Sequence, residues 1–293
     1  MTIPVPVTPL RAIKVRRDHR VELPEHVVTE EPLEIRLAEH GGQSQPVIVT
    51  MRTPGNDFEL AVGLLFTENL VLPNQIEAVS YCDGVREDPR RRYNTVTVRV
   101  GSARVGSGKA RPFVSSASCG VCGKSSIEDV LLAGDVVAPL PRSARGLPGS
   151  VVVSMPDQLR RSQKSFDRTG GLHAAGLFDQ TGMMFCARED VGRHNAVDKV
   201  IGNWLLNGAS HGAGQHVDQC DSLASYGLMV SGRVSFEIVQ KAAIAGIGAI
   251  CAVSAPTSLA VEAADALGLG LAGFVRGDSF NVYAHSERFD LDG

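Results

Sequence analysis

The pattern of apolar and polar positions is most regular near the carboxyl end of the chain. Between residues 227 and 275, short apolar runs alternate with segments in which apolar residues recur at helical spacing. The pattern predicts strands at residues 227–230, 249–253 and 271–275, and helices at residues 235–245 and 257–267. Strands that alternate with helices favour parallel pairing through right-handed crossovers. A final strand is expected at residues 281–285.

The segment before this region also favours an α/β arrangement. Residues 155–166 have a helical pattern, and residues 192–207 place Ala196, Val197, Val200, Ile201 and Trp204 on one helix face. Two strands, at residues 171–178 and 183–187, flank the turn sequence D-Q-T-G and predict a hairpin.

The amino-terminal part predicts a smaller α+β unit. Strands are expected at residues 33–37, 46–51 and 94–100, and an amphipathic helix at residues 56–70. Residues 101–122 are rich in Gly, Ser and Ala, which is typical of a linker. We therefore expect an amino-terminal α+β domain at residues 1–114, a thiol loop and linker at residues 115–150, and an α/β domain at residues 151–293.

Composition and charge narrow the class of protein. The chain has 293 residues, 43% hydrophobic and 21% charged, with a net charge of −3. No overall field draws it to nucleic acid or to acidic membranes. The first residues lack an apolar segment of signal-peptide length, and the weakly polar run at residues 242–261 contains Pro256 and two serines. These features predict a cytoplasmic protein with neither a nucleic-acid nor a membrane partner.

Two of the six cysteines lie where no large side chain can bury them. Cys119 and Cys122 belong to the sequence S-S-A-S-C-G-V-C-G-K, just before a helix expected at residues 125–132. The helix start and Lys124 both favour the thiolate. A C-x-x-C pair fits redox exchange, zinc binding or sulfur carriage, but no second pair of zinc ligands has matching spacing. Cys251, in an apolar run, is expected in the core.

Four further blocks place polar residues beside glycine at strand ends. They are T-G-G-L-H-A-A-G with His173, R-E-D-V-G-R-H-N with Asp190, Gly192, Arg193 and His194, V-S-G-R with Ser231, Gly232 and Arg233, and F-V-R-G-D-S, which comprises Phe274, Val275, Arg276, Gly277, Asp278 and Ser279. Each also has a structural interpretation, as a core histidine, a helix cap or a hairpin tip. Together they predict a crevice for a phosphate-bearing nucleotide at the carboxyl ends of parallel strands. The arginines would bind oxyanions, and Asp190 would accept hydrogen bonds from the amino groups of a polar heterocycle.

These blocks, with R-T-P-G-N-D-F-E-L-A-V-G-L-L-F-T-E upstream, resemble the formate dehydrogenase accessory sulfurtransferase family. The resemblance implies transfer of persulfide sulfur from a cysteine desulfurase to the molybdenum cofactor, a bis(molybdopterin guanine dinucleotide), for formate dehydrogenase. It implies Cys119 as the carrier, Cys122 as a helper, and a cofactor loop at residues 274–279. It also implies a cytidine-deaminase-like α/β/α sandwich for the carboxyl-terminal domain. The deaminase zinc motifs are absent, because Ala-Ala follows His173, and we expect no metal site.

The sequence therefore predicts a sulfur carrier with a persulfide intermediate. Its partners would be a cysteine desulfurase and the formate dehydrogenase apoenzyme, and GDP would mimic part of the cofactor. Two other functions stay open: a dithiol oxidoreductase that uses the same thiols, and a nucleotide-binding chaperone of the apoenzyme without sulfur transfer. Whether the chain forms a homodimer is also open.

Overall fold

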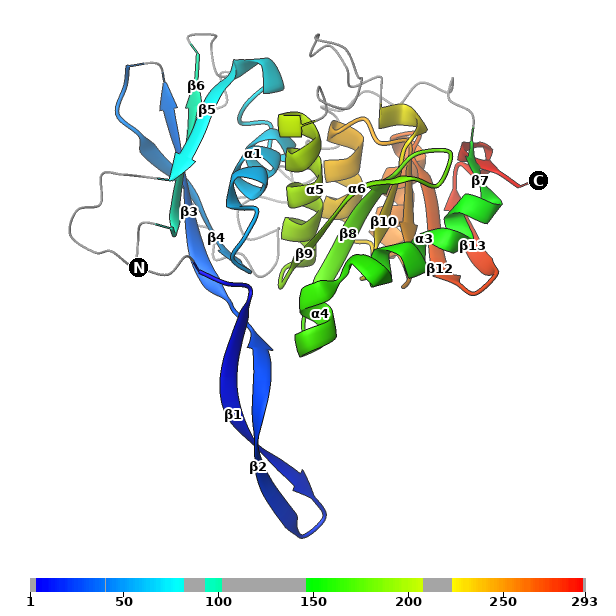
Figure 1. Cartoon of the computed structure of the whole chain (residues 1–293). Helices are drawn as coiled ribbons and strands as arrows, with labels where there is room; N and C mark the ends of the chain where they lie inside the picture. Colours follow the sequence, from blue (N-terminus) through cyan, green and yellow to red (C-terminus); the bar gives the residue numbers. More distant parts are fainter. Residues whose placement is uncertain (1–3, 40, 82–92, 102–145, 208–222, 292–293) are drawn as a thin grey trace.

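The computed structural model describes residues 4–39, 41–81, 93–101, 146–207 and 223–291. Cys119, Cys122 and the helix expected at residues 125–132 lie outside the described residues. The described elements form two units joined side by side, with a long hairpin that projects away from both (Figure 1).

The projecting hairpin, which we call the arm, consists of strands β1 (Val7–Arg16) and β2 (His19–Val28). The strands pair in antiparallel fashion with one unbroken register, from Val7 opposite Val28 to Arg16 opposite His19. Most of their side chains are exposed, on both faces. The sequence analysis did not predict these strands, because neither face is buried and no regular alternation of apolar and polar residues marks them.

The amino-terminal unit is a four-stranded sheet covered on one face by a helix. Its strands lie in the order β4-β3-β6-β5. The elements are β3 (Glu31–Glu39), β4 (Gln45–Arg52), α1 (Asp57–Thr67), a short 3-10 turn at Pro73–Gln75, β5 (Ile76–Tyr81) and β6 (Thr95–Val100). Leu33, Val96 and Val98 pack with Leu60 and Leu65 of α1 in one apolar cluster. The predicted strands β3, β4 and β6 and the helix α1 are confirmed, whereas β5 was not predicted.

The carboxyl-terminal unit contains a six-stranded sheet in the order β13-β12-β11-β10-β8-β9. Its elements are β7 (Leu147–Pro148), α3 (Gly149–Ser162), α4 (Lys164–Thr169), β8 (His173–Phe178), β9 (Met184–Asp190), α5 (Arg193–Asn207), β10 (Gly227–Val230), α6 (Phe236–Ile244), β11 (Ala249–Ala252), α7 (Ser258–Ala266), β12 (Gly270–Arg276), β13 (Ser279–Ala284), a 3-10 turn at Ser286–Arg288 and β14 (Phe289–Asp290). The predicted parallel pairing is confirmed for β10 with β11 and for β11 with β12. The remaining strand pairs of this sheet are antiparallel.

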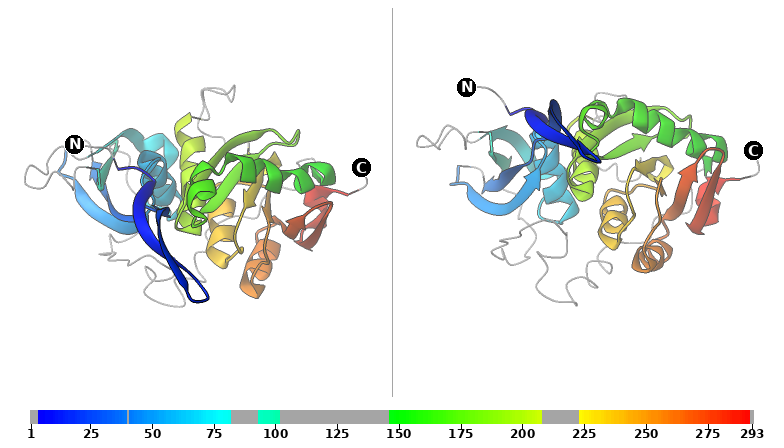
Figure 2. Two further views of the ribbon diagram at one scale, coloured as in Figure 1. Left: turned by 60° about the horizontal axis from the view of Figure 1, so that its bottom comes forward. Right: turned by 90° about the horizontal axis from the view of Figure 1, so that it is seen from below.

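Side chains of alternate residues on the central strands point to opposite faces of the sheet, and helices cover both faces. Met229 and Cys251 point to the face that α3 covers, whereas Leu228, Val230 and Ile250 point to the face that α5, α6 and α7 cover. Figure 2 shows α3 on one side of the sheet and α6 and α7 on the other. The α/β class is therefore confirmed, as is the core position of Cys251. None of the described helices is long and apolar enough to cross a membrane.

The two units meet where α1 crosses α5. Gly63 and Gly202 form the closest point, since a Cβ atom at Gly63 would overlap the carbonyl oxygen of Asp198 and one at Gly202 would overlap that of Glu59. Glycine is required at both positions because the two backbones touch there.

Candidate functional site

The sheet register brings four of the predicted blocks to one edge. His173, at the start of β8, lies opposite Asp190, at the end of β9. The amide of Ser231, just after β10, donates to the carbonyl oxygen of Ala174 over 2.9 Å. One strand further, the amide of Phe274 donates to the carbonyl oxygen of Ser254 over 3.2 Å. Because β8 runs antiparallel to β10 and β9 runs antiparallel to β8, the start of β8 and the end of β9 lie at the same edge as the carboxyl ends of the parallel strands.

The side chains of His173 and Arg193 meet at Gly232 at this edge. A Cβ atom at Gly232 would lie 3.2 Å from Nδ1 of His173 and 4.0 Å from Cδ of Arg193, so the glycine leaves room for both side chains. Burial, aided by the neighbouring Arg193 and His194, lowers the pKa of His173. The Nε atom of Arg193 is buried and has no hydrogen-bond partner among the described residues. A buried donor without a partner is costly, and a ligand oxygen would satisfy it.

His194 lies in the first turn of α5, next to the start of α6. Its Nε2 atom lies 3.1 Å from Oγ of Ser235 and 3.4 Å from Oε2 of Glu237, and the Ser235 hydroxyl donates to Glu237 over 2.7 Å. The hydrogen bond with His194 lowers the pKa of Glu237 to about 2, although partial burial opposes this effect. The Glu237 carboxylate therefore stays ionised at neutral pH.

Asp190 lies at the same edge, but its carboxylate is fully engaged inside the protein. Oδ2 accepts from Nζ of Lys199 over 2.7 Å and from the Thr53 amide over 3.2 Å. Oδ1 accepts from the Gly192 amide over 2.8 Å and from Nδ2 of Asn195 over 3.1 Å. With two donors on each oxygen and no exposed surface, Asp190 has no free acceptor for a guanine ring in this structure. In this structure the Gly192 amide and the Asp190 carboxylate are bound to each other.

The block at residues 274–279 forms the end of β12 and the turn into β13. Phe274 adopts a left-handed backbone conformation, with φ of 53°, at a break in the strand register. Such strain in a residue other than glycine often marks a functional position. Arg276 lies over the Phe274 ring at 5.7 Å and is exposed, as are Gly277, Asp278 and Ser279, whereas Val275 is buried in the core.

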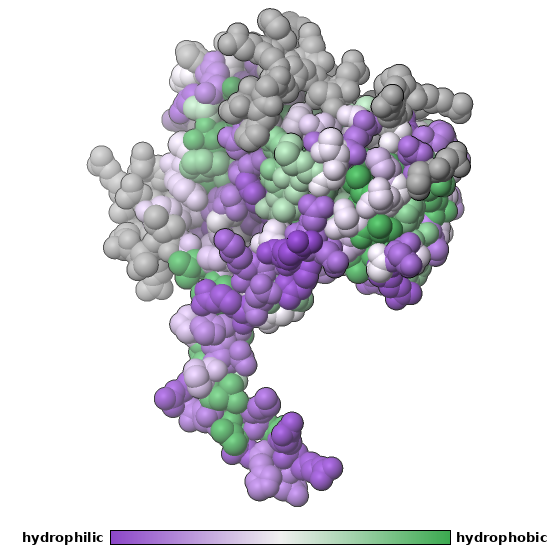
Figure 3. Space-filling view, turned by 45° about the vertical axis from the view of Figure 1, so that its right-hand side comes forward, coloured by the Kyte–Doolittle hydropathy of each residue, from purple (hydrophilic) through white to green (hydrophobic). Residues whose placement is uncertain are grey.

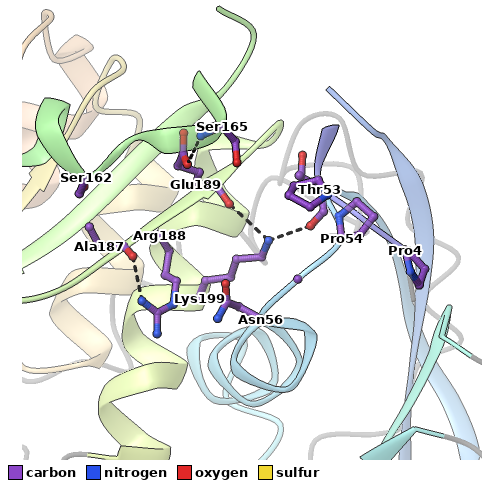
Figure 4. A pocket seen from close by; sticks show the side chains of 12 residues that line it. Pro4, Thr53, Pro54, Asn56, Ser162, Ser165, Ala187, Arg188, Glu189 and Lys199 are labelled. Carbon is purple, nitrogen blue, oxygen red and sulfur yellow. Dashed lines mark hydrogen bonds between the residues drawn. The ribbon is translucent and has the colours of Figure 1, made fainter. Parts of the chain in front are cut away.

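A separate cavity of about 230 Å³ lies at the junction of the two units (Figure 4). Its walls come from the segment before the arm, the loop before α1, the region of α3 and α4, strand β9 and helix α5. The lining residues are Pro4, Pro6, Thr53, Pro54, Gly55, Asn56, Ser162, Ser165, Ala187, Arg188, Glu189 and Lys199. Lys199 donates here to the carbonyl oxygens of Thr53 and Glu189, over 2.9 and 3.4 Å, so its ammonium group is already bound.

Two cysteines, Cys186 and Cys251, lie in the part of the chain that the structure describes, and both are buried. Burial raises the pKa of Cys186 and of Cys251 to about 12, so both stay protonated at neutral pH and neither suits nucleophilic attack. Cys119 and Cys122 lie outside the described residues. Among the described residues, no group of three or more His, Cys, Asp or Glu side chains is arranged to hold a metal ion.

Sequence reasoning missed three residues at this site. Ser235 and Glu237 follow the V-S-G-R block, and Lys199 lies four residues after the R-E-D-V-G-R-H-N block. Glu237 lies two positions after Ser235 in the first turn of α6, which was a signal for a contact with a neighbouring cation. The burial of Lys199 carries no such signal, because it depends in part on Thr53 of the amino-terminal unit, whose carbonyl oxygen accepts from Lys199.

The fold and the site define an α/β protein of two joined units, in which histidine and arginine side chains gather at the ends of parallel strands. The model of the FdhD/NarQ family matches residues 28–290, and the chain belongs to this family. It is 47% identical over 268 residues to the sulfur carrier protein FdhD of Mycolicibacterium paratuberculosis, covering 90% of this chain and 92% of that protein. It is 42% identical over 271 residues to the protein of the same name from Thermoplasma volcanium, covering 92% and 90%.

A solved structure is also similar to this chain. It is described as a formate dehydrogenase accessory protein from Desulfotalea psychrophila, with a TM-score of 0.72 and 25% sequence identity. The match covers 97% of this chain and 99% of that one. The resemblance to an accessory family for formate dehydrogenase, stated from the motifs, is thereby confirmed.

Proposed function

We propose that this chain is a sulfur carrier that takes persulfide sulfur from a cysteine desulfurase and delivers it to a molybdenum cofactor substrate, bis(molybdopterin guanine dinucleotide), for formate dehydrogenase. Relatives that carry the name sulfur carrier protein support the carrier role. The accessory-protein description of the similar solved structure supports formate dehydrogenase as the client. The carrier would act in the cytoplasm.

The observation that carries the ligand site is the unpartnered Nε atom of Arg193 beside His173 and Gly232. Arg193 and the exposed Arg233 would bind phosphate oxygens of the nucleotide part, since guanidinium groups match oxyanions in bidentate fashion. Ser231 and His194 would border the same crevice, and the turn at residues 274–279 would close its far side. GDP would bind as a partial mimic of the cofactor.

In the proposed reaction, the thiolate of Cys119 attacks the outer sulfur of the desulfurase persulfide. A new S–S bond forms on Cys119, the old S–S bond breaks, and the desulfurase cysteine leaves as a thiolate. The persulfide proton stays on the transferred sulfur. Because one S–S bond replaces another, the step needs no oxidant or reductant. Cys122 would assist as a second thiol. The high pKa values of Cys186 and Cys251 support this choice, because a thiol that stays protonated is a poor nucleophile.

We further propose that the carboxyl-terminal unit is a cytidine-deaminase-like sandwich and that the thiol loop, at residues 115–150, joins it to the amino-terminal domain. The layered arrangement of α3, the sheet and α5 to α7 supports the first point. A thiol between two units could face a donor and an acceptor in turn.

The mass of the protein after incubation with a cysteine desulfurase and cysteine tests the carrier role. We expect a gain of one sulfur atom on the wild type and on Cys122→Ala, and none on Cys119→Ala. In a cell that carries only Cys119→Ala, formate dehydrogenase activity should be lost while the carrier remains folded. A loss of two hydrogens would instead indicate a dithiol oxidoreductase, and an unchanged mass would indicate a chaperone without sulfur transfer.

Calorimetry with GDP and ADP tests the crevice. Arg193→Ala and Arg233→Ala should each weaken GDP binding about 10- to 150-fold, the scale of a lost hydrogen bond to a charged group. Arg161→Ala, an exposed arginine on α3, serves as the control and should leave the affinity unchanged. Equal and weak binding of both nucleotides by the wild type would show that the crevice does not recognise guanine.

A further inference from the structure

The last described residues, 285–291, form a strap across the end of the carboxyl-terminal unit. After its 3-10 turn, the strap continues as β14, which pairs with β7 in a register that places Phe289 opposite Leu147. Figure 1 shows β7 beside this end of the chain. Phe289 is buried in the same apolar cluster as Leu147. The strap therefore holds β7, the first described strand of this unit, in place.

The strap also touches the backbone on either side of it. A Cβ atom at Gly146 would lie 2.7 Å from the carbonyl carbon of Phe289, so the two backbones are in contact there. In the 3-10 turn, Nε of Arg288 donates to the carbonyl oxygen of Gly268 over 3.1 Å. A movement of the strap would therefore disturb both β7 and the loop that follows α7.

His285 begins the strap and joins it to α7. Its Nε2 atom lies 2.9 Å from the carbonyl oxygen of Asp265, in the last turn of α7, and its Nδ1 atom lies 2.8 Å from Oε1 of Glu287. A carbonyl oxygen and a carboxylate oxygen only accept hydrogen bonds, so both ring nitrogens of His285 must carry a proton. The ring in this structure is therefore an imidazolium with one positive charge.

The surroundings of this ring favour its positive charge. Among the described residues, the charged groups that face it are the carboxylates of Asp265, from α7, and of Glu287, from the 3-10 turn. The Asp265 carbonyl oxygen also lies at the carboxyl end of α7, where the helix dipole is negative. The hydrogen bond to this carbonyl, followed by that to Glu287, raises the pKa of His285, although burial opposes them.

The backbone of His285 is held in a conformation that costs energy. Its φ of 49° and ψ of 64° lie in the left-handed region, which is unfavourable for any residue but glycine. Such a conformation persists only while contacts around the residue hold it. The two hydrogen bonds of the ring are contacts of this kind. Their loss would favour another backbone angle and a different path for the strap.

We propose that His285 is a pH-sensitive latch, whose imidazolium holds the strap against α7 and whose loss of a proton loosens the strap and its pairing with β7. A neutral imidazole has one N–H group, so it can donate to only one of the two acceptors. A histidine whose pKa is raised on folding stabilises the fold only while it is protonated. The latch is therefore closed below pH ~6.5, the ordinary pKa of histidine, and opens as the pH rises above it.

Hydrogen exchange of the full chain tests the latch. Mass spectrometry of a peptide that covers residues 286–291 gives a protection factor, which is corrected for the effect of pH on the chemical exchange rate. In the wild type this protection should fall between about pH 6 and about pH 9. The fall should be about tenfold for each unit by which the pKa of His285 exceeds its ordinary value.

Two asparagine variants separate the latch from other effects of pH. His285→Asn removes the titrating ring, and asparagine tolerates the left-handed backbone conformation. Its protection should stay at the low level that the wild type reaches at high pH. His19→Asn is the matched control, because His19 is an exposed histidine at the tip of the arm. Figure 3 shows the arm projecting away from the rest of the molecule, so this variant should keep the wild-type profile.

Glu287→Gln keeps the proposal testable even if His285→Asn misfolds. Glutamine retains an acceptor oxygen but carries no charge, so the fall in protection should begin at a lower pH than in the wild type. A residue with only a structural role would lower the protection equally at every pH. A wild type whose protection does not change with pH, a wild-type profile in His285→Asn, or an unshifted profile in Glu287→Gln would each overturn the proposal. None of these results depends on the sulfur-carrier role.

Discussion

Lys199 is a buried ammonium group, 1% exposed, whose charge is balanced by the carboxylate of Asp190. Removal of one partner from a buried pair leaves the other charge uncompensated, at a cost of about 3–5 kcal/mol. We therefore expect Asp190→Ala to lower the free energy of unfolding by about this amount. Denaturation in urea, followed by the fluorescence of Trp204, measures the change.

The matched control is Asp278→Ala, an exposed aspartate in the turn after β12. Its effect on the free energy of unfolding should stay within about 0.5 kcal/mol, the usual range for surface substitutions. If Asp190→Ala were as stable as the wild type but bound GDP more weakly, Asp190 would belong to the ligand site, as its sequence first indicated.

The ionisation of Glu237 makes the stability of the folded protein decrease as the pH falls. Its pKa is lowered to about 2 in the folded protein, chiefly by the hydrogen bond with His194, whereas an unfolded glutamate titrates near 4.3. Its contribution to stability is therefore present above pH ~4.3 and is lost as the pH falls towards 2. The stability difference between wild type and Glu237→Gln, followed by thermal denaturation, should shrink across this window. His194→Gln should move the loss to higher pH, and a difference that grows on acidification would contradict the assignment.

At the scale of elements, the crossing of α1 and α5 depends on two glycines. Gly63→Ala and Gly202→Ala would each force the two backbones apart, because the added Cβ would overlap a carbonyl oxygen of the facing helix. Alanine favours a helix over glycine by about 1 kcal/mol, but overpacking costs about 1–3 kcal/mol or more. We expect a net loss of stability in both variants, measured as a lower midpoint of thermal unfolding.

Gly149→Ala is the control for this pair. Gly149 opens α3, and a Cβ atom there would make ordinary contact, 3.5 Å from the carbonyl oxygen of Asp290. This variant should unfold at the same temperature as the wild type or slightly higher. A stabilised Gly202→Ala would mean that the helices are not in backbone contact.

Elements with a buried face could be predicted from the sequence, and those without one could not. The helix–strand alternation at residues 227–275 was placed within one or two residues, because each element there buries one face or both in a core. The arm was missed, because its apolar residues are spread over two exposed faces and interrupted by Pro9 and Pro24. Strand β5 was missed as well, because only Ile76, Val79 and Tyr81 of it are partly buried and they do not alternate regularly.

The sequence blocks that form the site could be predicted, but most contacts between their side chains could not. Sequence placed His173, Arg193 and Gly232 at strand ends, and the register brings them together. The role of Asp190 could not be read in the same way. Its Thr53 partner lies 137 residues earlier, and one sequence contains no sign of such a contact.

At the scale of the whole molecule, buried polar networks tie the two units together. Glu59 of α1 accepts from Arg188 and, over 2.8 Å, from Nδ2 of Asn203. Nζ of Lys241 reaches Oγ1 of Thr67 over 2.9 Å and Oδ1 of Asp198 over 3.0 Å. Separation of the units would expose these groups without partners, which is costly, so neither unit gains by unfolding alone.

The chain should therefore unfold as one cooperative system, although its sequence suggests separate domains. Trp204 is the only tryptophan, and it packs between Phe185 and Tyr226, so its fluorescence reports on the carboxyl-terminal unit. Hydrogen exchange of the β3 and β6 amides reports on the amino-terminal unit. In the wild type the two probes should give the same free energy of unfolding. In Gly202→Ala, where the junction is forced apart, β3 and β6 should exchange at a lower free energy than Trp204 reports. Two separate transitions in the wild type would show that the junction does not couple the units.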